Sequence, residues 1–286
     1  MKVLNFGSLN IDYVYKVKNF VTPGETVKSK ELIRKVGGKG LNQSVAMARA
    51  GLMVYHAGAV GEDGIFLVDF LKSDNVNTDY VRFSDIPTGH AIIQVDEKGE
   101  NCILLFGGAN QSISEDYADE ILSNFSQGDF LVLQNETNIV SYVIDKAYEK
   151  GLKIIFNPSP ITENITDFSL VKVSLFILNE VEGEALTGEK DVNNIITELI
   201  EKYPASEFVL TLGDKGAIYF NKNEKIAVEA EKAEVVDTTA AGDTFTGYFI
   251  ATIAKGKSVS EALCIATKAA AKAITVLGAA ESIPYM

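Results

Sequence analysis

I-I-F at residues 154–156 and F-V-L at residues 208–210 are runs of consecutive apolar residues with no polar position between them. Such runs are typical of strands that are buried on both faces of a sheet. Similar short apolar runs recur along the chain, and the sequence after each run is typical of a helix. The runs are residues 2–6, 54–59, 130–133, 153–156, 175–178 and 208–212. Alternating strands and helices form mostly parallel sheets covered on both faces. We therefore predict an α/β fold, a three-layer α/β/α sandwich with a mostly parallel central sheet.

One part of the chain breaks this alternation. Two apolar-rich stretches joined by the short loop E-K-G-E suit a β-hairpin, namely residues 89–96 and 101–106. Two earlier stretches are expected to join the hairpin in a small sheet that projects from the core, namely residues 13–17 and 26–36. A small element of this kind often serves as a lid over a site. We predict one domain over residues 1–286, with a β lid formed by about 12–36 and 88–107.

The composition excludes several classes of protein. The 286 residues are 47% hydrophobic and carry a formal net charge of -13, so the chain can bury a core and should repel polyphosphate backbones. We expect no nucleic-acid partner. No apolar run has the length of a membrane helix, and Asn5, Asn10 and Asp12 interrupt the start too early for a secretory signal, so we expect no membrane partner. Cys102 and Cys264 form no metal or disulfide pattern, which favours a cytoplasmic protein.

The strongest candidate for chemistry is V-V-D-T-T-A-A-G-D-T-F-T-G-Y at residues 235–248. Apolar residues recur after the turn at helical spacing, which places Ala241, Gly242 and Asp243 at a helix N-terminus. Free backbone N–H groups and the helix dipole make this end an anion site. Asp243 could then take a proton from an attacking hydroxyl while the amides of all three residues stabilise developing charge. The alternative is a plain capped helix.

A second cluster is V-G-G-K-G-L-N-Q-S-V-A-M-A-R-A-G at residues 36–51, where a glycine-rich turn opens a helix. Gly37, Gly38 and Gly40 are expected to leave room for a small ligand against the backbone. Asn42 offers both a donor and an acceptor to a hydroxyl. The spacing fits neither a phosphate-binding P-loop nor a dinucleotide fingerprint. The alternative is a turn without a ligand.

Several motifs in one order point to a known family. These motifs are G-S-L-N-I-D at 7–12, G-G-K-G-L-N-Q at 37–43, G-E-N at 99–101, G-G-A-N at 107–110, N-P-S-P at 157–160, N-E-V-E at 179–182, T-L-G-D-K-G at 211–216 and D-T-T-A-A-G-D at 237–243. With these motifs in this order, the chain resembles the ribokinase family of carbohydrate kinases nearly from end to end.

The resemblance implies a role for each matching residue of the acceptor site. Sugar hydroxyls would be bound by residues from three parts of the chain: Asn10, Asp12, Gly38, Lys39, Asn42 and Glu136. Asp243 would be the general base that deprotonates the primary hydroxyl of the sugar. The amides of Ala241 and Gly242 would form the anion hole for the γ-phosphoryl group. Phosphoryl transfer depends mainly on positioning and charge stabilisation, so one base and one anion hole suffice with a metal.

The resemblance also implies cofactor sites. Asn179 and Glu182 would hold Mg²⁺ and phosphate through water, although N-x-x-E is also an ordinary surface pattern. Thr211 and Gly213 would meet ATP, although T-L-G alone is simply a strand end. Potassium would be held by a loop of residues from two segments: Asp237, Thr239, Ala273, Val276, Gly278 and Ser282. The implied cofactors are therefore ATP, Mg²⁺ and K⁺.

These observations favour one function and leave others open. The leading hypothesis is an ATP-dependent kinase that converts D-ribose to D-ribose 5-phosphate. The alternatives are a kinase for fructose, for 2-keto-3-deoxygluconate or for a nucleoside, and a non-catalytic sugar or nucleotide sensor that kept the fold. The resemblance further implies a homodimer that forms through the lid sheet, because the edge of that sheet would otherwise be exposed.

Overall fold

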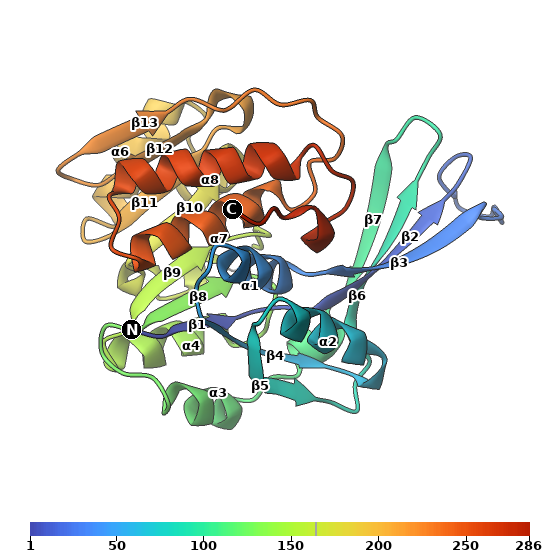
Figure 1. Cartoon of the computed structure of the whole chain (residues 1–286), viewed down its shortest axis with the longest axis horizontal. Coiled ribbons are helices and arrows are strands. Elements are labelled where there is room, and N and C mark those ends of the chain that lie inside the picture. Colours follow the sequence, from blue (N-terminus) through green and yellow to red (C-terminus); the bar gives the residue numbers. More distant parts are fainter. Residues whose placement is uncertain (164) are drawn as a thin grey trace.

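The computed structural model describes residues 1–163 and 165–286 and contains two separate sheets (Figure 1). The larger sheet has the strand order β13-β12-β11-β10-β9-β8-β1-β4-β5. Its strands pair in parallel from β11 to β5, whereas β12 and β13 pair antiparallel at one edge. The strand bounds are Val3–Phe6 (β1), Val54–Val60 (β4), Asn77–Phe83 (β5), Phe130–Gln134 (β8), Lys153–Asn157 (β9), Leu175–Asn179 (β10), Glu207–Thr211 (β11), Ala217–Phe220 (β12) and Lys225–Val228 (β13).

Helices cover both faces of this sheet. One face packs against α3 (Glu115–Leu122), α4 (Val140–Glu149), α5 (Glu180–Thr187) and α6 (Val192–Lys202). The other face packs against α1 (Lys39–Arg49), α2 (Ile65–Ser73), α7 (Ala241–Ala254) and α8 (Val259–Ala273). The predicted three-layer α/β/α sandwich is therefore confirmed.

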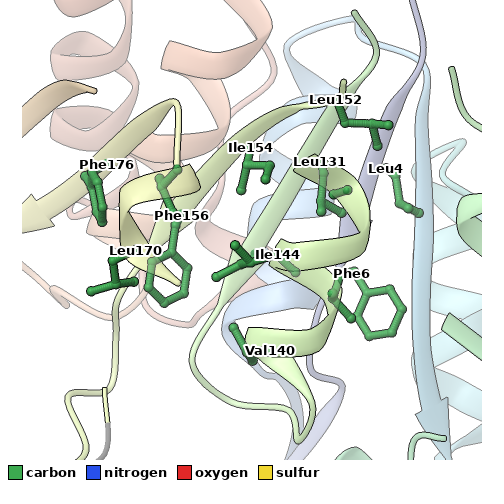
Figure 2. Packing of buried hydrophobic residues seen from close by; sticks show 14 of the residues in the cluster. Leu4, Phe6, Leu131, Val140, Ile144, Leu152, Ile154, Phe156, Leu170 and Phe176 are labelled. Atoms are coloured by element: carbon green, nitrogen blue, oxygen red, sulfur yellow. The ribbon is translucent and has the colours of Figure 1, made fainter. Parts of the chain in front are cut away.

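The apolar runs of the strands explain this layering, because successive side chains enter opposite layers. Ile154 and Phe156 of β9 pack into the cluster beneath α4, where Figure 2 shows them with Ile144, whereas Ile155 belongs to the cluster on the other face. The side chains of Ile154, Ile155 and Phe156 are all buried. The middle of β9 therefore has no solvent-facing position, which is why its sequence shows no polar alternation there.

The second sheet extends away from the body of the molecule (Figure 1). It has the order β3-β2-β6-β7, with bounds Asn10–Lys16 (β2), Glu31–Gly37 (β3), Gly89–Val95 (β6) and Asn101–Phe106 (β7). The predicted hairpin is confirmed, since β6 and β7 pair antiparallel from His90 with Phe106 to Val95 with Asn101. Residues 26–30, which we expected in this sheet, are not part of a strand, because β3 begins at Glu31.

The expectation that every apolar run leads into a helix was wrong at three strands. β1 is followed by a short loop and then β2, β9 leads into short 3-10 turns, and β11 is followed by a 3-10 turn and the antiparallel strand β12. The β11 run itself ends at Thr211, so Leu212 lies outside it. The sequence interpretation also missed β5, β12 and β13. No helix within residues 1–163 and 165–286 is long and apolar enough to cross a membrane.

Candidate active site

Asp243 lies in the first turn of α7, as predicted, and its side chain is buried against α1. Asn42 Nδ2 donates to Asp243 Oδ2 at 3.0 Å, and Gln43 Nε2 donates to Asp243 Oδ1 at 2.9 Å. Each carboxylate oxygen therefore accepts one amide hydrogen bond from consecutive residues of α1. This arrangement fixes the plane of the carboxylate relative to α1.

At the start of α7, two amides rather than the expected three are available to an anion. The N–H of Ala241 donates to the carbonyl of Thr238 at 3.2 Å and is thereby engaged. The amides of Gly242 and Asp243 belong to the first turn, which has no intrahelical carbonyl to offer them. A side chain at Gly242 would find no atom within 4 Å, so the space beside these amides is open.

A cleft of about 670 Å³ opens next to this helix start. Thr211 and Gly213, at the end of β11, line the cleft together with Ala241 and Gly242. Small apolar residues of α8 form another part of its wall, namely Ala270 and Ala271. The volume is in the range of small-molecule and cofactor pockets. Four of the residues singled out from the sequence therefore meet in one cavity.

Asn10 and Asp12 lie on β2, at the base of the small sheet. Asn10 is buried, and its Oδ1 accepts from Asn110 Nδ2 at 2.8 Å, while Asn110 Oδ1 accepts from the Leu9 amide at 3.0 Å. The carboxylate of Asp12 lies directly over Gly37, where any side chain would collide with it. Gly37 therefore makes room for Asp12 and not for a ligand, which corrects the expectation from the sequence.

Gly38 and Gly40 also serve the fold. Gly38 precedes α1 with φ 96°, a left-handed conformation that favours glycine. A Cβ on Gly40 would lie under 3.0 Å from backbone atoms of Gly7 and Ser8. These glycines let the start of α1 pack onto the loop after β1, and the expectation that they leave space for a ligand was wrong at Gly40.

Glu136 and Lys39 add two opposite charges beside Asp243. Glu136 Oε2 accepts from the Ser8 hydroxyl and, at 2.9 Å, from the Lys39 amide. Burial raises the pKa of Glu136, although these hydrogen bonds oppose the rise. Burial alone would lower the pKa of the Lys39 ammonium, but the carboxylates of Asp243, Glu136 and Glu182 outweigh it and raise the pKa. Lys39 therefore carries its charge among three acidic groups.

The pKa of Asp12 is raised to about 7. Burial is the largest cause, followed by the negative charges of Glu136 and Glu281, while the Lys35 ammonium acts in the opposite direction. A carboxyl with this pKa changes its charge near neutral pH, unlike an ordinary aspartate.

Asn179 and Glu182 form a capping box at the start of α5. Asn179 Oδ1 accepts from the Glu182 amide at 2.9 Å, and the Glu182 carboxylate accepts from the Asn179 amide at 3.0 Å and from Asn179 Nδ2 at 3.1 Å. Both carboxylate oxygens already have protein donors, so these residues fit an ion that is held through water. No group of three His, Cys, Asp or Glu side chains in residues 1–163 and 165–286 could hold a metal directly.

The two segments of the predicted potassium loop lie side by side. The Gly278 amide donates to Asp237 Oδ2 at 3.0 Å, and the Asp237 amide donates to the carbonyl of Ile274 at 3.1 Å. Asp237 Oδ1 accepts from the amide and the hydroxyl of Thr239. The carboxylate of Asp237 therefore shapes the loop, and the hydrogen bonds from Thr239 and Gly278 outweigh burial and lower its pKa.

The remaining members of this loop lie at the end of α8 and after it. Ala273 is the last residue of α8, its carbonyl accepts from the Val276 amide at 3.1 Å, and the side chain of Val276 is exposed. Ser282 is buried and donates to the carbonyl of Ala279 at 2.8 Å. Backbone carbonyls and a hydroxyl are the oxygen ligands that suit a hard cation, so the residues fit the predicted ion.

Comparison with known proteins agrees with this geometry. A model of pfkB family carbohydrate kinases matches residues 1–286. The chain belongs to the pfkB family of carbohydrate kinases. This pfkB family kinase is 34% identical to the ribokinase of Haemophilus influenzae over 295 residues, which cover 97% of this chain and 94% of that protein.

Solved structures agree as well. The ribokinase of Thermotoga maritima matches the pfkB family kinase with a TM-score of 0.89 at 34% identity, over 100% of this chain and 96% of the other. Arabidopsis thaliana ribokinase, solved in complex with ribose and ATP, matches with a TM-score of 0.88 at 31% identity, over 99% and 95% of the two chains. The resemblance inferred from the motifs is thereby confirmed.

Sequence reasoning assigned no role to several residues that hold the site of this pfkB family kinase together. Gln43, Ser8 and Asn110 all lie inside the quoted motifs, so the pattern contained them without showing what they contact. Gln134 lies outside those motifs, at the buried end of β8. A polar residue at the end of a fully buried strand was the signal that could have identified it.

Proposed function

We propose that this pfkB family kinase transfers the γ-phosphoryl group of ATP to the primary hydroxyl of D-ribose and releases D-ribose 5-phosphate and ADP. The position of Asp243 carries the proposal, because Asn42 of α1 donates to its carboxylate while its neighbours Ala241 and Gly242 line the cleft. The complex of the Arabidopsis relative with ribose and ATP supports both substrates.

Asn42 is well suited to a sugar hydroxyl. Its Nδ2 donates to Asp243, whereas its Oδ1 is buried and has no hydrogen-bond partner among the described residues. A buried acceptor without a partner is costly, and a hydroxyl that donates to it would remove that cost. We assign Asn10, Asp12 and Glu136 to the other hydroxyls, with Gly38 and Lys39 at the edge of the sugar site. This polar set favours a free sugar over a nucleoside, whose base would require an apolar slot.

The reaction follows from this placement. Asp243 accepts the proton of the primary hydroxyl, the hydroxyl oxygen forms a bond to the γ-phosphorus, and the bond from that phosphorus to the oxygen bridging to the β-phosphate breaks. The amides of Gly242 and Asp243 stabilise the negative charge that develops on the phosphoryl oxygens. Lys39 adds a positive charge on the side of the acceptor.

We assign the cleft with Thr211 and Gly213 to ATP. Mg²⁺, when bound with the nucleotide, supplies charge neutralisation at the phosphates. Asn179 and Glu182 would orient it through water, and Glu182 is close enough to act on Lys39 electrostatically. We assign K⁺ to the loop that contains Asp237, Ala273 and Ser282. Further oxygens would come from the other members of this loop, namely Thr239, Val276 and Gly278.

A coupled assay of ATP consumption tests the substrate. The acceptors would be D-ribose, D-fructose, 2-keto-3-deoxygluconate and adenosine, each with Mg²⁺ and with or without K⁺. We expect turnover on D-ribose to exceed that on the other acceptors and to rise with K⁺. Faster turnover on another acceptor would overturn ribose while leaving the phosphoryl transfer intact. Calorimetric binding of sugar without turnover of any acceptor would favour the sensor hypothesis.

The raised pKa of Asp12 makes the affinity for sugar depend on pH. The carboxyl is mostly neutral at pH 6 and mostly ionised at pH 8, and only the ionised form accepts hydroxyl hydrogen bonds as a charged group on both of its oxygens. We expect KM for the sugar to fall ~10-fold from pH 6 to pH 8. Steady-state kinetics across this range would measure it. In Asp12→Asn, KM should be high and flat with pH, and a wild-type slope in that variant would contradict the assignment.

We propose that the enzyme is a homodimer formed by the small sheet. The edge strand β7 exposes four consecutive large apolar side chains, namely Ile103, Leu104, Leu105 and Phe106. An exposed apolar edge strand is a surface for pairing with another chain. Light scattering should therefore give twice the chain mass of 31.0 kDa.

Two single variants test the two faces of β7 separately, because Leu104 and Leu105 point to opposite faces of the sheet. We expect Leu104→Lys or Leu105→Lys to yield a monomer at micromolar concentration. A monomeric wild-type chain, or dimers in both variants, would contradict the proposed interface.

A further inference from the structure

Gln43 has a buried side chain that connects the catalytic centre to the core. Its Nε2 donates to Asp243 Oδ1 at 2.9 Å and to Asn157 Oδ1 at 3.2 Å. Gln43 is fully buried, and neither its position nor its hydrogen bonds place it against the sugar or the nucleotide cleft. Its only contact with the proposed chemistry is through the carboxylate.

The orientation of this amide is set from inside the molecule. An amide has one donor end and one acceptor end, so a hydrogen bond to its oxygen determines where its nitrogen points. Gln134 Nε2 donates to Gln43 Oε1 at 2.7 Å and to Asn5 Oδ1 at 2.9 Å. Asn5 Nδ2 in turn donates to the Gly40 carbonyl at 2.7 Å and to Ser44 Oγ at 2.8 Å.

These bonds permit one arrangement of the three amides. Asn5 directs its oxygen to Gln134, Gln134 directs its nitrogen to Gln43, and Gln43 is left to direct its nitrogen to Asp243. On the other side, Asn157 Nδ2 donates to the Ile177 carbonyl, so Asn157 offers its oxygen to Gln43. If the Gln43 amide were reversed, its oxygen would face both the carboxylate and Asn157 Oδ1, which is repulsive at hydrogen-bond distance.

We propose that Gln43, oriented by Gln134, is a positioning residue that holds the carboxylate of Asp243 ionised and aimed at the acceptor hydroxyl. The proposal rests on the proposed function. Its physical basis is that hydrogen-bond donors to a carboxylate favour the charged form of that group. This effect is strongest where water is excluded. The charged side chains that act on Asp243 are Lys39 and Glu136, and Gln43 is a neutral donor that pH does not change.

The test is the pH dependence of kcat in Gln43→Met, which keeps the volume of the side chain and removes its donor. We expect kcat of the full chain at pH 6 to fall ~10-fold while kcat at pH 9 stays within ~3-fold of wild type, because the acidic limb of the profile moves to higher pH. KM for ATP should stay within ~2-fold, since the nucleotide cleft is untouched.

Gln134→Met should shift the acidic limb in the same direction, because the Gln43 amide loses the bond that orients it. It provides a second test if Gln43→Met fails to fold. Thr252→Val is the matched control, since Thr252 is a buried hydroxyl on the same helix as Asp243 and donates only within that helix. It should lose some thermal stability and keep the wild-type pH profile.

The outcomes separate this inference from the proposed function. If wild type is active and both variants keep its pH profile, Gln43 is a structural residue and the inference is wrong. If kcat falls equally at every pH, the inference is also wrong. If wild type phosphorylates no acceptor, the proposed function fails, and titration of the Asp243 ¹³Cγ resonance in wild type and Gln43→Met still tests Gln43 without turnover.

Discussion

Asp243→Asn should reduce kcat about 10²- to 10⁴-fold. The variant keeps the size of the side chain but cannot take a proton from the acceptor hydroxyl. It also brings an NH₂ group toward Asn42 Nδ2 or Gln43 Nε2, which both donate to the carboxylate in the wild-type chain. KM for ATP should change little, because the cleft is lined by other residues. Single-turnover kinetics at saturating substrates would measure the chemical step.

Asp116→Asn is the matched control for this variant. Asp116 also lies in the first turn of a helix, α3, but it is exposed and outside the site. The same chemical change there should leave kcat unaltered. Full activity of Asp243→Asn would show that another group takes the proton and would remove the basis of the proposed mechanism.

Arg49→Met should be the most destabilising of the variants considered. Arg49 and Asp74 form a bidentate ion pair at 2.7 and 2.9 Å, with side chains only 8% and 2% exposed. Arg49 also donates to the carbonyls of Ala280 and Ile283, and thereby ties the C-terminal segment to α1. Removing it leaves the Asp74 charge buried, with Tyr285 as a remaining donor, at a cost of about 3–5 kcal/mol.

Calorimetric or denaturant unfolding would measure this loss, which corresponds to a fall in Tm of roughly 10 °C. Lys16→Met is the control, because Lys16 and Glu31 also pair, at 3.0 Å, but with both side chains about half exposed. It should cost about 1 kcal/mol or less. Arg49→Met combined with Asp74→Leu should recover part of the lost stability, and failure to do so would mean that packing, not charge, sets the cost.

The layers of the fold could be predicted because a strand that is buried on both faces has apolar residues at successive positions of its sequence. The runs of β8, β9 and β10 are apolar at successive positions since both faces meet helices. The antiparallel edge could not be predicted in this way. A-I-Y-F in β12 is equally apolar, and its direction is set by the short turn at Gly213–Lys215 rather than by its composition.

The site shows a similar division. Asp243 could be predicted because its position at a helix start is local, readable from the turn and the spacing that follows. The role that we propose for Gln43 could not be predicted, because it depends on Gln134, which is 91 residues away in the chain. The capping box of Asn179 and Glu182 was readable, since an Asn followed three residues later by Glu before a helix is its signature. The motif itself, without that helix, indicates only a surface pattern or an ion-binding pair, so the cap becomes evident once the start of α5 is known.

The two proposed substrate sites are built from different halves of the chain. The residues proposed to face the sugar lie between Asn10 and Glu136, whereas the cleft proposed for ATP is lined by residues between Thr211 and Ile274. Asp243 is the point where the halves meet. After a gene duplication, one copy could therefore drift toward a new acceptor through substitutions in its first half alone, while the inherited donor machinery stays under purifying selection.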